Sequence, residues 1–203
     1  LIGNACVAVA GAGKHGQDGL GPLVHVPGLH RLGSRARPLM RSEVDLADFR
    51  AVERLFVRER PSGVIHCAAS SRSPACQADP AAARVQNVAV TRRLAELAAE
   101  IPMVFLSSDL VFDGRRNGAE GGYREDDAVN PLSVYAETKV EAEAWVRRNP
   151  RHAIVRTSLN AAPFLLENAI SDSLSVVLLA LLSKAAVDWP PYRSVTCDSV
   201  TLL

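Results

Sequence analysis

The stretch "VFLSSDLVFDG", residues Val104 to Gly114, joins a short apolar run to a polar turn. An apolar run of this length, followed by turn residues, is typical of a strand buried inside a sheet. Ser107 and Ser108 fall at the end of the strand, which we expect over residues 103–108. Ligands gather at the carboxyl ends of the strands in open parallel sheets. The two serines are therefore candidates for a functional site.

Similar apolar runs alternate with longer helical patterns along most of the chain. The strands are expected over residues 6–11, 29–35, 63–70, 103–108 and 152–158. Helices are expected between them, with Asp48 and Asp79 as N-caps and with Pro131 opening the helix that contains Tyr135. This alternation indicates an α/β fold, a parallel sheet with helices on both faces. Right-handed crossovers favour a doubly wound, Rossmann-type topology.

Composition and charge narrow the class of protein. Apolar residues make up 48% and charged residues 22% of the 203 residues, which is usual for a globular enzyme. A net charge of +1 gives no electrostatic basis for binding nucleic acid or a membrane. The run Leu174–Leu182 is too short to span a bilayer, and no secretory signal is visible. The four cysteines show no CxxC spacing, which argues against a metal site and fits the cytoplasm: Cys6, Cys67, Cys76 and Cys197.

A glycine pattern follows the first expected strand. Gly11, Gly13 and Gly16 form GxGxxG, in which small residues let the backbone turn tightly and approach a pyrophosphate at a helix N-terminus. A second register, in which Gly19 is the last glycine, reads GxxGxxG and fits nearly as well. The first register is preferred because it leaves a full-length helix before the second strand. Either register predicts a dinucleotide-binding turn.

Basic residues near this turn bear on the choice of dinucleotide. Lys14 and His15 lie inside the turn, where they are candidate phosphate contacts, although a solvent-exposed His15 is equally compatible. Arg35 and Arg37 follow the second expected strand, where the adenosine ribose of a dinucleotide lies. A basic residue there suits the 2′-phosphate of NADP, whereas an acidic one suits NAD. NADP(H) is thus preferred over NAD(H), with two solvated surface arginines as the alternative.

The stretch "NPLSVYAETKVEAEAWV", Asn130 to Val146, reads as a helix with Tyr135 and Lys139 one turn apart on one face. A tyrosine can pass a proton to a substrate oxygen, and a nearby lysine is expected to lower the pKa of its phenol. A strand-end serine can donate a hydrogen bond to the same oxygen. Taken alone, a tyrosine and a lysine at this spacing are more often an incidental pair on an ordinary surface helix. Together with the serines and the glycine turn, it predicts a reductase site.

These motifs resemble the extended short-chain dehydrogenase/reductase family, with its Ser–Tyr–Lys triad and YxxxK motif. Within that family, "VIHCAAS", "SSDLVFDG", "YREDDAVNPLSVYAETKVEAE" and "IVRTS" are most similar to the dTDP-4-dehydrorhamnose reductase type, a group that includes the regulatory beta subunit of methionine adenosyltransferase. The resemblance covers Val44 to Ser158 well. It implies an NAD(P)-binding Rossmann domain over residues 1–160. Residues 161–203 would then form a partial, apparently truncated, substrate-binding region.

The resemblance also implies roles for individual residues. Ser108 would be the catalytic hydroxyl, and Tyr135 would protonate the keto oxygen of the substrate. Lys139 would bind the nicotinamide ribose and lower the pKa of Tyr135, and Asn87 would support the site and its water. The other implied cofactor contacts are Ser107, then Asp45 and Leu46 beside the adenine, and Ala68, Ala69 and Ser70 under the phosphate and ribose.

The implied activity is NADPH-dependent reduction of a nucleotide-linked 4-keto sugar in dTDP-rhamnose biosynthesis. The alternatives are a nucleotide-sugar epimerase or dehydratase, or an NADP-binding regulatory subunit. Dehydratases place an acidic pair beside the serine or threonine, whereas Ser108 is followed by a single acid, Asp109. The expected partner is a small nucleotide sugar, and a homodimer is compatible with the pattern.

Overall fold

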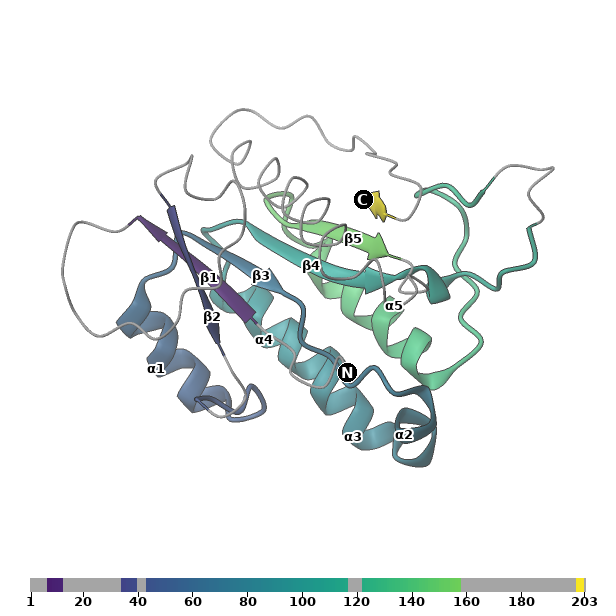
Figure 1. Ribbon diagram of the computed structural model, residues 1–203, viewed down its shortest axis with the longest axis horizontal. Coiled ribbons are helices and arrows are strands. Elements are labelled where there is room, and N and C mark those ends of the chain that lie inside the picture. The colour runs from purple at the N-terminus through teal and green to yellow at the C-terminus, as the bar shows by residue number, and fades with distance from the viewer. Residues whose placement is uncertain (1–6, 13–33, 40–42, 117–121, 158–199, 203) are drawn as a thin grey trace, which may run out of the picture.

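The structure, a computed structural model, describes residues 7–12, 34–39, 43–116, 122–157 and 200–202 (Figure 1). Its centre is a six-stranded sheet with the strand order β2-β1-β3-β4-β5-β6. The strands are β1 (Val7–Ala12), β2 (Ser34–Leu39), β3 (Gly63–His66), β4 (Met103–Ser108), β5 (Ala153–Thr157) and β6 (Val200–Leu202).

The middle of the sheet is parallel, as the alternation of strands and helices predicts. Strand β3 pairs in parallel with β4, and β4 pairs in parallel with β5. Strand β1, however, runs antiparallel to both β2 and β3, and β6 runs antiparallel to β5. The apolar pattern of β1 predicts a strand correctly but carries no information about its direction, because backbone N–H and C=O groups can pair in either sense.

The second strand lies later in the chain than predicted. It was expected over residues 29–35 and is observed over Ser34–Leu39. Arg35 and Arg37 therefore lie within β2, opposite Gly11 and Val9 of β1, rather than after the strand. The rest of the predicted glycine turn, Gly13, Lys14, His15 and Gly16, lies outside the described residues, as do residues 158–199.

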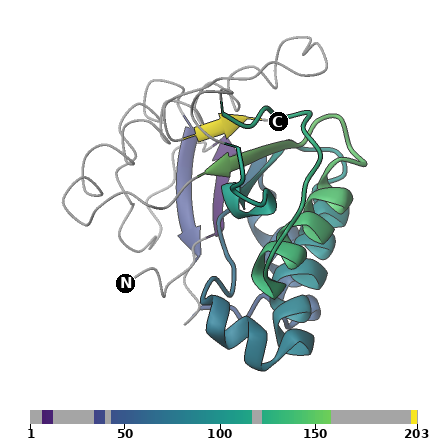
Figure 2. The same ribbon diagram turned by 90° about the vertical axis from the view of Figure 1, so that its right-hand side faces the viewer.

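Three helices cover one face of the sheet (Figure 2). They are α1 (Phe49–Glu59), α4 (Val90–Leu97) and α5 (Val134–Val146), with α4 in contact with both others. The Asp48 side chain caps α1 as predicted, accepting from the Ala51 N–H at 3.0 Å. The start of α5 was predicted wrongly, because the Ser133 hydroxyl supplies its cap, so the helix begins three residues after Pro131. None of the described helices is long and apolar enough to cross a membrane.

The helical run that ends in α4 contains an irregular turn. It begins as α3 (Pro80–Arg84), where Asp79 caps the helix as predicted by accepting from the Ala82 N–H at 2.9 Å. A π-helical turn, η2 (Val85–Ala89), then joins α3 to α4. Turns of this kind are rare and are frequent at functional sites. This one buries the side chain of Asn87.

Two further short helices were not predicted. Helix α2 (Ser73–Ala78) follows β3, and the 3₁₀ turn η3 (Asp109–Val111) follows β4 directly. The second of these determines the surroundings of Ser108, because it fixes the chain immediately after the strand.

The core lies between the sheet and the three helices. Its side chains come from β3, β4 and β5 on one side and from α1, α4 and α5 on the other, and each buried one contributes about 1.5–3 kcal/mol. The principal members are Val52, Val64, Leu94, Met103, Phe105, Val146 and Ile154. A set of buried polar side chains continues this core toward the carboxyl end of β4: His66, Asn87, Thr91, Ser107, Ser108, Thr138, Lys139, Glu143 and Arg156.

Candidate active site

Ser108 ends strand β4 and is 4% exposed. Its hydroxyl accepts a hydrogen bond from the Leu110 N–H at 3.2 Å, and so caps the turn η3. The same hydroxyl donates to Oδ1 of Asp109 at 3.1 Å. The predicted strand-end hydroxyl is therefore in place, held by the turn that follows the strand.

Tyr135 lies in the first turn of α5 and is 5% exposed. Burial raises the pKa of its phenol to about 12, and the neighbouring Cys76 and Asp109 act in the same direction by electrostatic repulsion of the phenolate. Hydrogen bonding with the Ser108 side chain lowers this pKa by less. Strand and helix thus bring Ser108 and Tyr135 together, as the sequence predicts. The predicted lowering of the Tyr135 pKa is wrong, because desolvation raises this pKa by more than the hydrogen bond with Ser108 lowers it.

Lys139 is 3% exposed and lies one turn after the tyrosine. Its ammonium donates to the Leu106 carbonyl at 2.8 Å and lies 4.6 Å from the centroid of the Phe105 ring. It is 5.8 Å from the centroid of the Tyr135 ring. Burial lowers the pKa of Lys139 to about 8, while Cys67 and Glu143 oppose this shift. The ammonium is thus bonded to the backbone of β4.

Asn87 connects the loop after β3 to helix α5. Its Oδ1 accepts from the Ser70 N–H at 2.7 Å, and its Nδ2 donates to the Ser70 carbonyl at 3.1 Å and to Thr138 Oγ1 at 2.9 Å. The Thr138 hydroxyl in turn donates to the carbonyl of Tyr135 at 2.7 Å. Both N–H donors of Asn87 are therefore in use within the protein, and its role here is to position its neighbours.

A second polar chain lies behind Asn87. The Thr91 hydroxyl donates to the Asn87 carbonyl at 2.6 Å and lies 2.9 Å from His66 Nε2. His66 is fully buried. Burial lowers its pKa to about 3, with a smaller contribution from the charge of Lys139. This histidine is therefore neutral at any physiological pH and belongs to the supporting core.

The buried ion pair between Glu143 and Arg156 was not predicted. Arg156 Nε and Nη2 donate to the two carboxylate oxygens of Glu143 at 2.9 and 2.7 Å. The Ser107 hydroxyl donates to Oε1 of the same carboxylate at 2.6 Å, and Arg147 to Oε2 at 2.8 Å. Ser107 was expected to contact the cofactor; in the structure its hydroxyl is bonded to α5. The available signals were weak: Glu143 falls one turn after Lys139, and Arg156 interrupts an apolar strand.

A cavity of about 510 Å³ opens beside this end of β4. Asp109 and Leu110 from η3 line it, as do Leu132 and Ser133 from the segment before α5. Leu110 and Leu132 remain 49% and 65% exposed. The side chain of Arg156 reaches the same cavity. The cavity is thus lined by Asp109, which follows Ser108, and by Ser133, which lies two residues before Tyr135.

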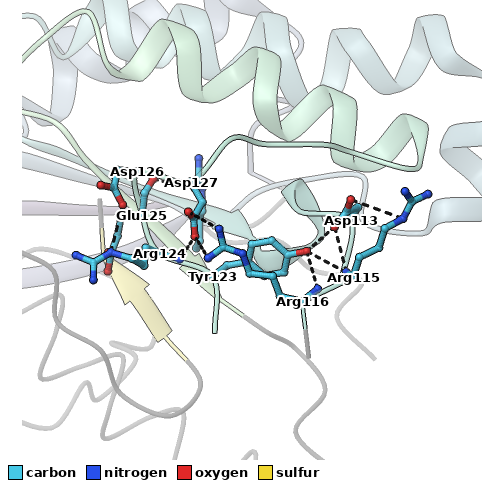
Figure 3. A network of polar contacts seen from close by, with 9 residues as sticks. Asp113, Arg115, Arg116, Tyr123, Arg124, Glu125, Asp126 and Asp127 are labelled. Carbon is cyan, nitrogen blue, oxygen red and sulfur yellow. Dashed lines mark hydrogen bonds and ion pairs between the residues drawn. The ribbon is translucent and has the colours of Figure 1, made fainter. Parts of the chain in front are cut away.

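Phe112, Asp113 and Tyr123 also line the cavity. They belong to a loop, described over residues 112–116 and 122–130, whose polar contacts are drawn in Figure 3. The rings of Phe112 and Tyr123 stack with their centroids 4.4 Å apart. The Tyr123 hydroxyl donates to Asp113, and Asn130 donates to the other oxygen of that carboxylate at 3.0 Å. Hydrogen bonds from Tyr123, the Arg115 backbone and Asn130 lower the pKa of Asp113 to about 2. The carboxylate therefore organises the loop and remains charged.

An exposed ion pair closes the same loop. Arg116 Nη1 and Nη2 bond to the two oxygens of Asp127 at 2.7 and 2.8 Å (Figure 3). The Arg116 guanidinium also lies 5.2 Å from the centroid of the Tyr123 ring. The Arg124 N–H and Arg116 both lower the pKa of Asp127.

The other predicted cofactor residues fall into two groups. Ala68 is buried in the main core, and Ala69 packs against the small cluster that contains Tyr135. Ser70 is held by Asn87, as described above. This segment after β3 therefore lies next to the predicted triad.

The second group is not brought to the triad. Asp45 is exposed and accepts from the Ala47 N–H at 3.0 Å, and Leu46 packs against the main core. Ala10 pairs with Gly63, the first residue of β3. Gly11 therefore lies at the amino end of the parallel strands, whereas Ser108 lies at their carboxyl end. Arg35 pairs with Gly11 and lies at the same end of the sheet. The cofactor contacts of these residues stay predictions.

A serine at the end of β4 and a tyrosine and a lysine on α5 lie together at the carboxyl end of a parallel strand, an arrangement consistent with the extended short-chain dehydrogenase/reductase family. The RmlD substrate binding domain family matches residues 13–161. Because this match covers most of the chain, the chain belongs to that family, in agreement with the resemblance to dTDP-4-dehydrorhamnose reductases.

Two kinds of relative are found among known proteins. Methionine adenosyltransferase 2 subunit beta of Xenopus tropicalis is 39% identical over 131 residues, which is 62% of this chain and 38% of that protein. A dTDP-4-dehydrorhamnose reductase of Sinorhizobium fredii is 33% identical over 159 residues, which is 74% of this chain and 49% of that protein. The chain therefore spans less than half the length of these relatives.

Two solved structures of dTDP-4-dehydrorhamnose reductases are similar to this chain. The dTDP-4-dehydrorhamnose reductase of Bacillus anthracis, in complex with NADP, is 28% identical with a TM-score of 0.56 and covers 59% of this chain and 43% of that one. A dTDP-4-dehydrorhamnose reductase structure from Clostridium acetobutylicum, 22% identical with a TM-score of 0.60, covers 79% of this chain and 64% of that one, and supports the fold.

Proposed function

We propose that this chain is the nucleotide-binding and catalytic part of an NADP(H)-dependent reductase of a nucleotide-linked 4-keto sugar such as dTDP-4-dehydrorhamnose. The observation that carries the proposal is the convergence of Ser108, Tyr135 and Lys139 at the carboxyl end of β4. The similarity to the Bacillus anthracis reductase, which was solved with NADP, and to the Sinorhizobium fredii reductase supports it.

The chemistry of Lys139 fits a nicotinamide nucleotide. An ammonium has three N–H donors. Within the described part of the chain, the Leu106 carbonyl is its one hydrogen-bond acceptor. A buried ammonium with unused donors is suited to the hydroxyls of a ribose. In this proposal Lys139 holds the nicotinamide ribose, and NADPH, when bound, supplies the hydride.

The protonation state of Tyr135 suits a proton donor. With a pKa raised to about 12, the phenol is neutral at physiological pH and carries the proton to be given. Tyr135 donates that proton to the keto oxygen of the substrate, and Ser108 turns its hydroxyl from Asp109 toward the same oxygen. Lys139 is cationic below its pKa of about 8 and stabilises the phenolate that remains.

The proposal is tested by mixing the complete protein with NADPH and dTDP-4-dehydrorhamnose and following the absorbance of the reduced nicotinamide. Turnover is expected, and Tyr135→Phe should lower kcat by about 10²–10⁴-fold, the usual contribution of a positioned acid. NADPH affinity, measured by fluorescence titration, should change less than about threefold, because Lys139 is retained. Turnover that survives in Tyr135→Phe would contradict the assignment of the acid.

A second function is favoured by one specific observation, the 39% identity to methionine adenosyltransferase 2 subunit beta. In this alternative the chain binds NADP and regulates a methionine adenosyltransferase without turning over a sugar. Tight NADP binding with no oxidation of NADPH, together with co-purification of a methionine adenosyltransferase catalytic subunit, would support it against the reductase.

A further inference from the structure

One buried carboxylate joins the helix and the strand that carry the proposed triad. Glu143 lies on α5, two turns after Tyr135 and one turn after Lys139, and its side chain is fully buried. It accepts a hydrogen bond from the hydroxyl of Ser107, the residue before Ser108 on β4. A single side chain thus connects the element that positions the phenol and the ammonium to the element that positions the serine.

The carboxylate is held in place from a third element. Arg156 of β5 binds both of its oxygens, is 2% exposed and donates through Nη1 to the Glu125 carbonyl at 3.3 Å. Paired hydrogen bonds between a guanidinium and a carboxylate restrict both groups to one relative orientation. The position of the Ser107 hydroxyl is therefore fixed relative to β5 as well as to α5.

We propose that Glu143, oriented by Arg156, is a positioning residue that holds the end of β4 against α5, so that Ser108 and Tyr135 can bond one substrate oxygen. This inference rests on the reductase proposal for its catalytic consequence. The mechanical link itself does not depend on that proposal, because it consists of hydrogen bonds among buried residues.

The charge of Glu143 has a second effect, on Lys139. Two groups face this ammonium from the sheet: His66, the last residue of β3, and Cys67, which follows it. Two more, Tyr135 and Glu143, face it from α5 itself. Burial lowers the pKa of Lys139, and Cys67 and Glu143 oppose that shift. Removal of the negative charge at Glu143 should therefore let Lys139 lose its proton at a lower pH.

An ion pair that served stability alone would neither hold the end of β4 in place nor change the pKa of Lys139. Such a pair can often be replaced by apolar side chains of similar size without loss of the fold. The double variant Glu143→Met/Arg156→Met keeps the volume and removes both charges together. Ser107→Ala leaves the ion pair in place and removes only the hydrogen bond to the strand. Glu141→Gln, on an exposed position of the same helix, is the matched control for Glu143→Gln.

The first measurement is amide hydrogen exchange at Leu110, whose N–H donates to the Ser108 hydroxyl. Exchange should become at least about tenfold faster in the double variant and in Ser107→Ala, because the end of β4 is released. The amides of α1 should be unchanged, as should Leu110 in Glu141→Gln. Wild-type exchange at Leu110 in both variants would overturn the proposal. This readout needs no turnover, so a failure of the reductase proposal is seen separately.

The second measurement is the pH dependence of kcat in the complete protein. The alkaline limb should lie near pH 8 in the wild type and move to lower pH in Glu143→Gln, which removes the negative charge and keeps that of Arg156. The value of kcat should fall by about tenfold or more in Ser107→Ala, with KM for NADPH within about twofold. An unmoved alkaline limb and an unchanged kcat would contradict the positioning role.

Discussion

The buried pair Glu143–Arg156 and the exposed pair Arg116–Asp127 have nearly the same geometry. In each, two guanidinium nitrogens bond to two carboxylate oxygens, at 2.9 and 2.7 Å in the first and at 2.7 and 2.8 Å in the second. Glu143 and Arg156 are 0% and 2% exposed, whereas Arg116 and Asp127 are 38% and 18% exposed. The surroundings, and not the contact distances, should therefore decide what each pair contributes.

The same contrast governs ionisation. In the buried site, desolvation shifts the pKa values of His66, Lys139 and Tyr135 toward their neutral forms. In the exposed loop, hydrogen bonds and nearby arginines lower the pKa values of Asp113 and Asp127, toward their charged forms. A site that keeps its phenol protonated is suited to donate a proton, whereas the charged carboxylates of the loop are suited to fix the conformation of the cavity lining.

The largest difference between the two regions is expected when a carboxylate becomes an amide. Glu143→Gln leaves the buried charge of Arg156 without a counter-ion and should lower the free energy of unfolding by about 3–5 kcal/mol. Asp127→Asn should have less than about a fifth of that effect, because water solvates the guanidinium that is left. Urea unfolding of the two variants measures both. Equal losses would contradict the contrast drawn here.

The next difference concerns two asparagines. Asn87→Ala removes three hydrogen bonds and takes the partner from the part-buried Ser70 N–H, so the free energy of unfolding should fall by about 2–3 kcal/mol. Asn130→Ala removes one exposed bond to Asp113 and should have a clearly smaller effect. Thermal denaturation followed by circular dichroism compares them, and a larger effect of Asn130→Ala would reverse the ranking.

The buried histidine should make stability depend on pH. The pKa of His66 is lowered to about 3 in the folded protein, against about 6.5 in the unfolded chain. Below pH 6.5 the unfolded state binds the additional proton, so stability falls as the pH falls from 6.5 toward 3. At pH 5 the loss from this group should be about 2 kcal/mol relative to pH 7.5.

The variant His66→Gln isolates that contribution. The difference in its free energy of unfolding between pH 7.5 and pH 5, measured with urea, should be smaller than the wild-type difference by the same amount. Identical pH profiles for the two proteins would show that folding does not lower the pKa of His66.

The smallest expected effect lies in the loop. Tyr123→Phe keeps the stacking on Phe112 and removes the hydroxyl that bonds to Asp113 and to two backbone N–H groups. The cost should be about 1 kcal/mol or less, because water can replace these partners. Chemical denaturation gives the value. A loss as large as that of Asn87→Ala would mean that the loop is part of the cooperative core.

Much of the triad could be predicted from local patterns. The apolar run before Ser108 predicts the strand β4 with its observed ends, and the spacing of Tyr135 and Lys139 predicts one helix face. The carboxyl end of a parallel strand and the following helix then lie together by the rules of the fold. The caps at Asp48 and Asp79 were equally readable, because each precedes a helical pattern directly.

Other features depend on contacts that no local pattern shows. The segment Val85–Ala89 reads as ordinary helix, whereas in the structure it is a π turn whose residue Asn87 bonds to Ser70 and Thr138. The direction of β1 is set by pairing and not by its apolar residues. The shift in the pKa of Tyr135 depends on burial, which the spacing of tyrosine and lysine does not reveal.

The most direct test is a crystal structure of the complete protein with NADP⁺ bound. The account predicts the nicotinamide ring beside Ser108 and Tyr135, with the Lys139 ammonium within hydrogen-bond distance of the adjoining ribose. A cofactor bound away from the carboxyl end of β4, or serine and tyrosine hydroxyls too far apart to reach one atom, would contradict it.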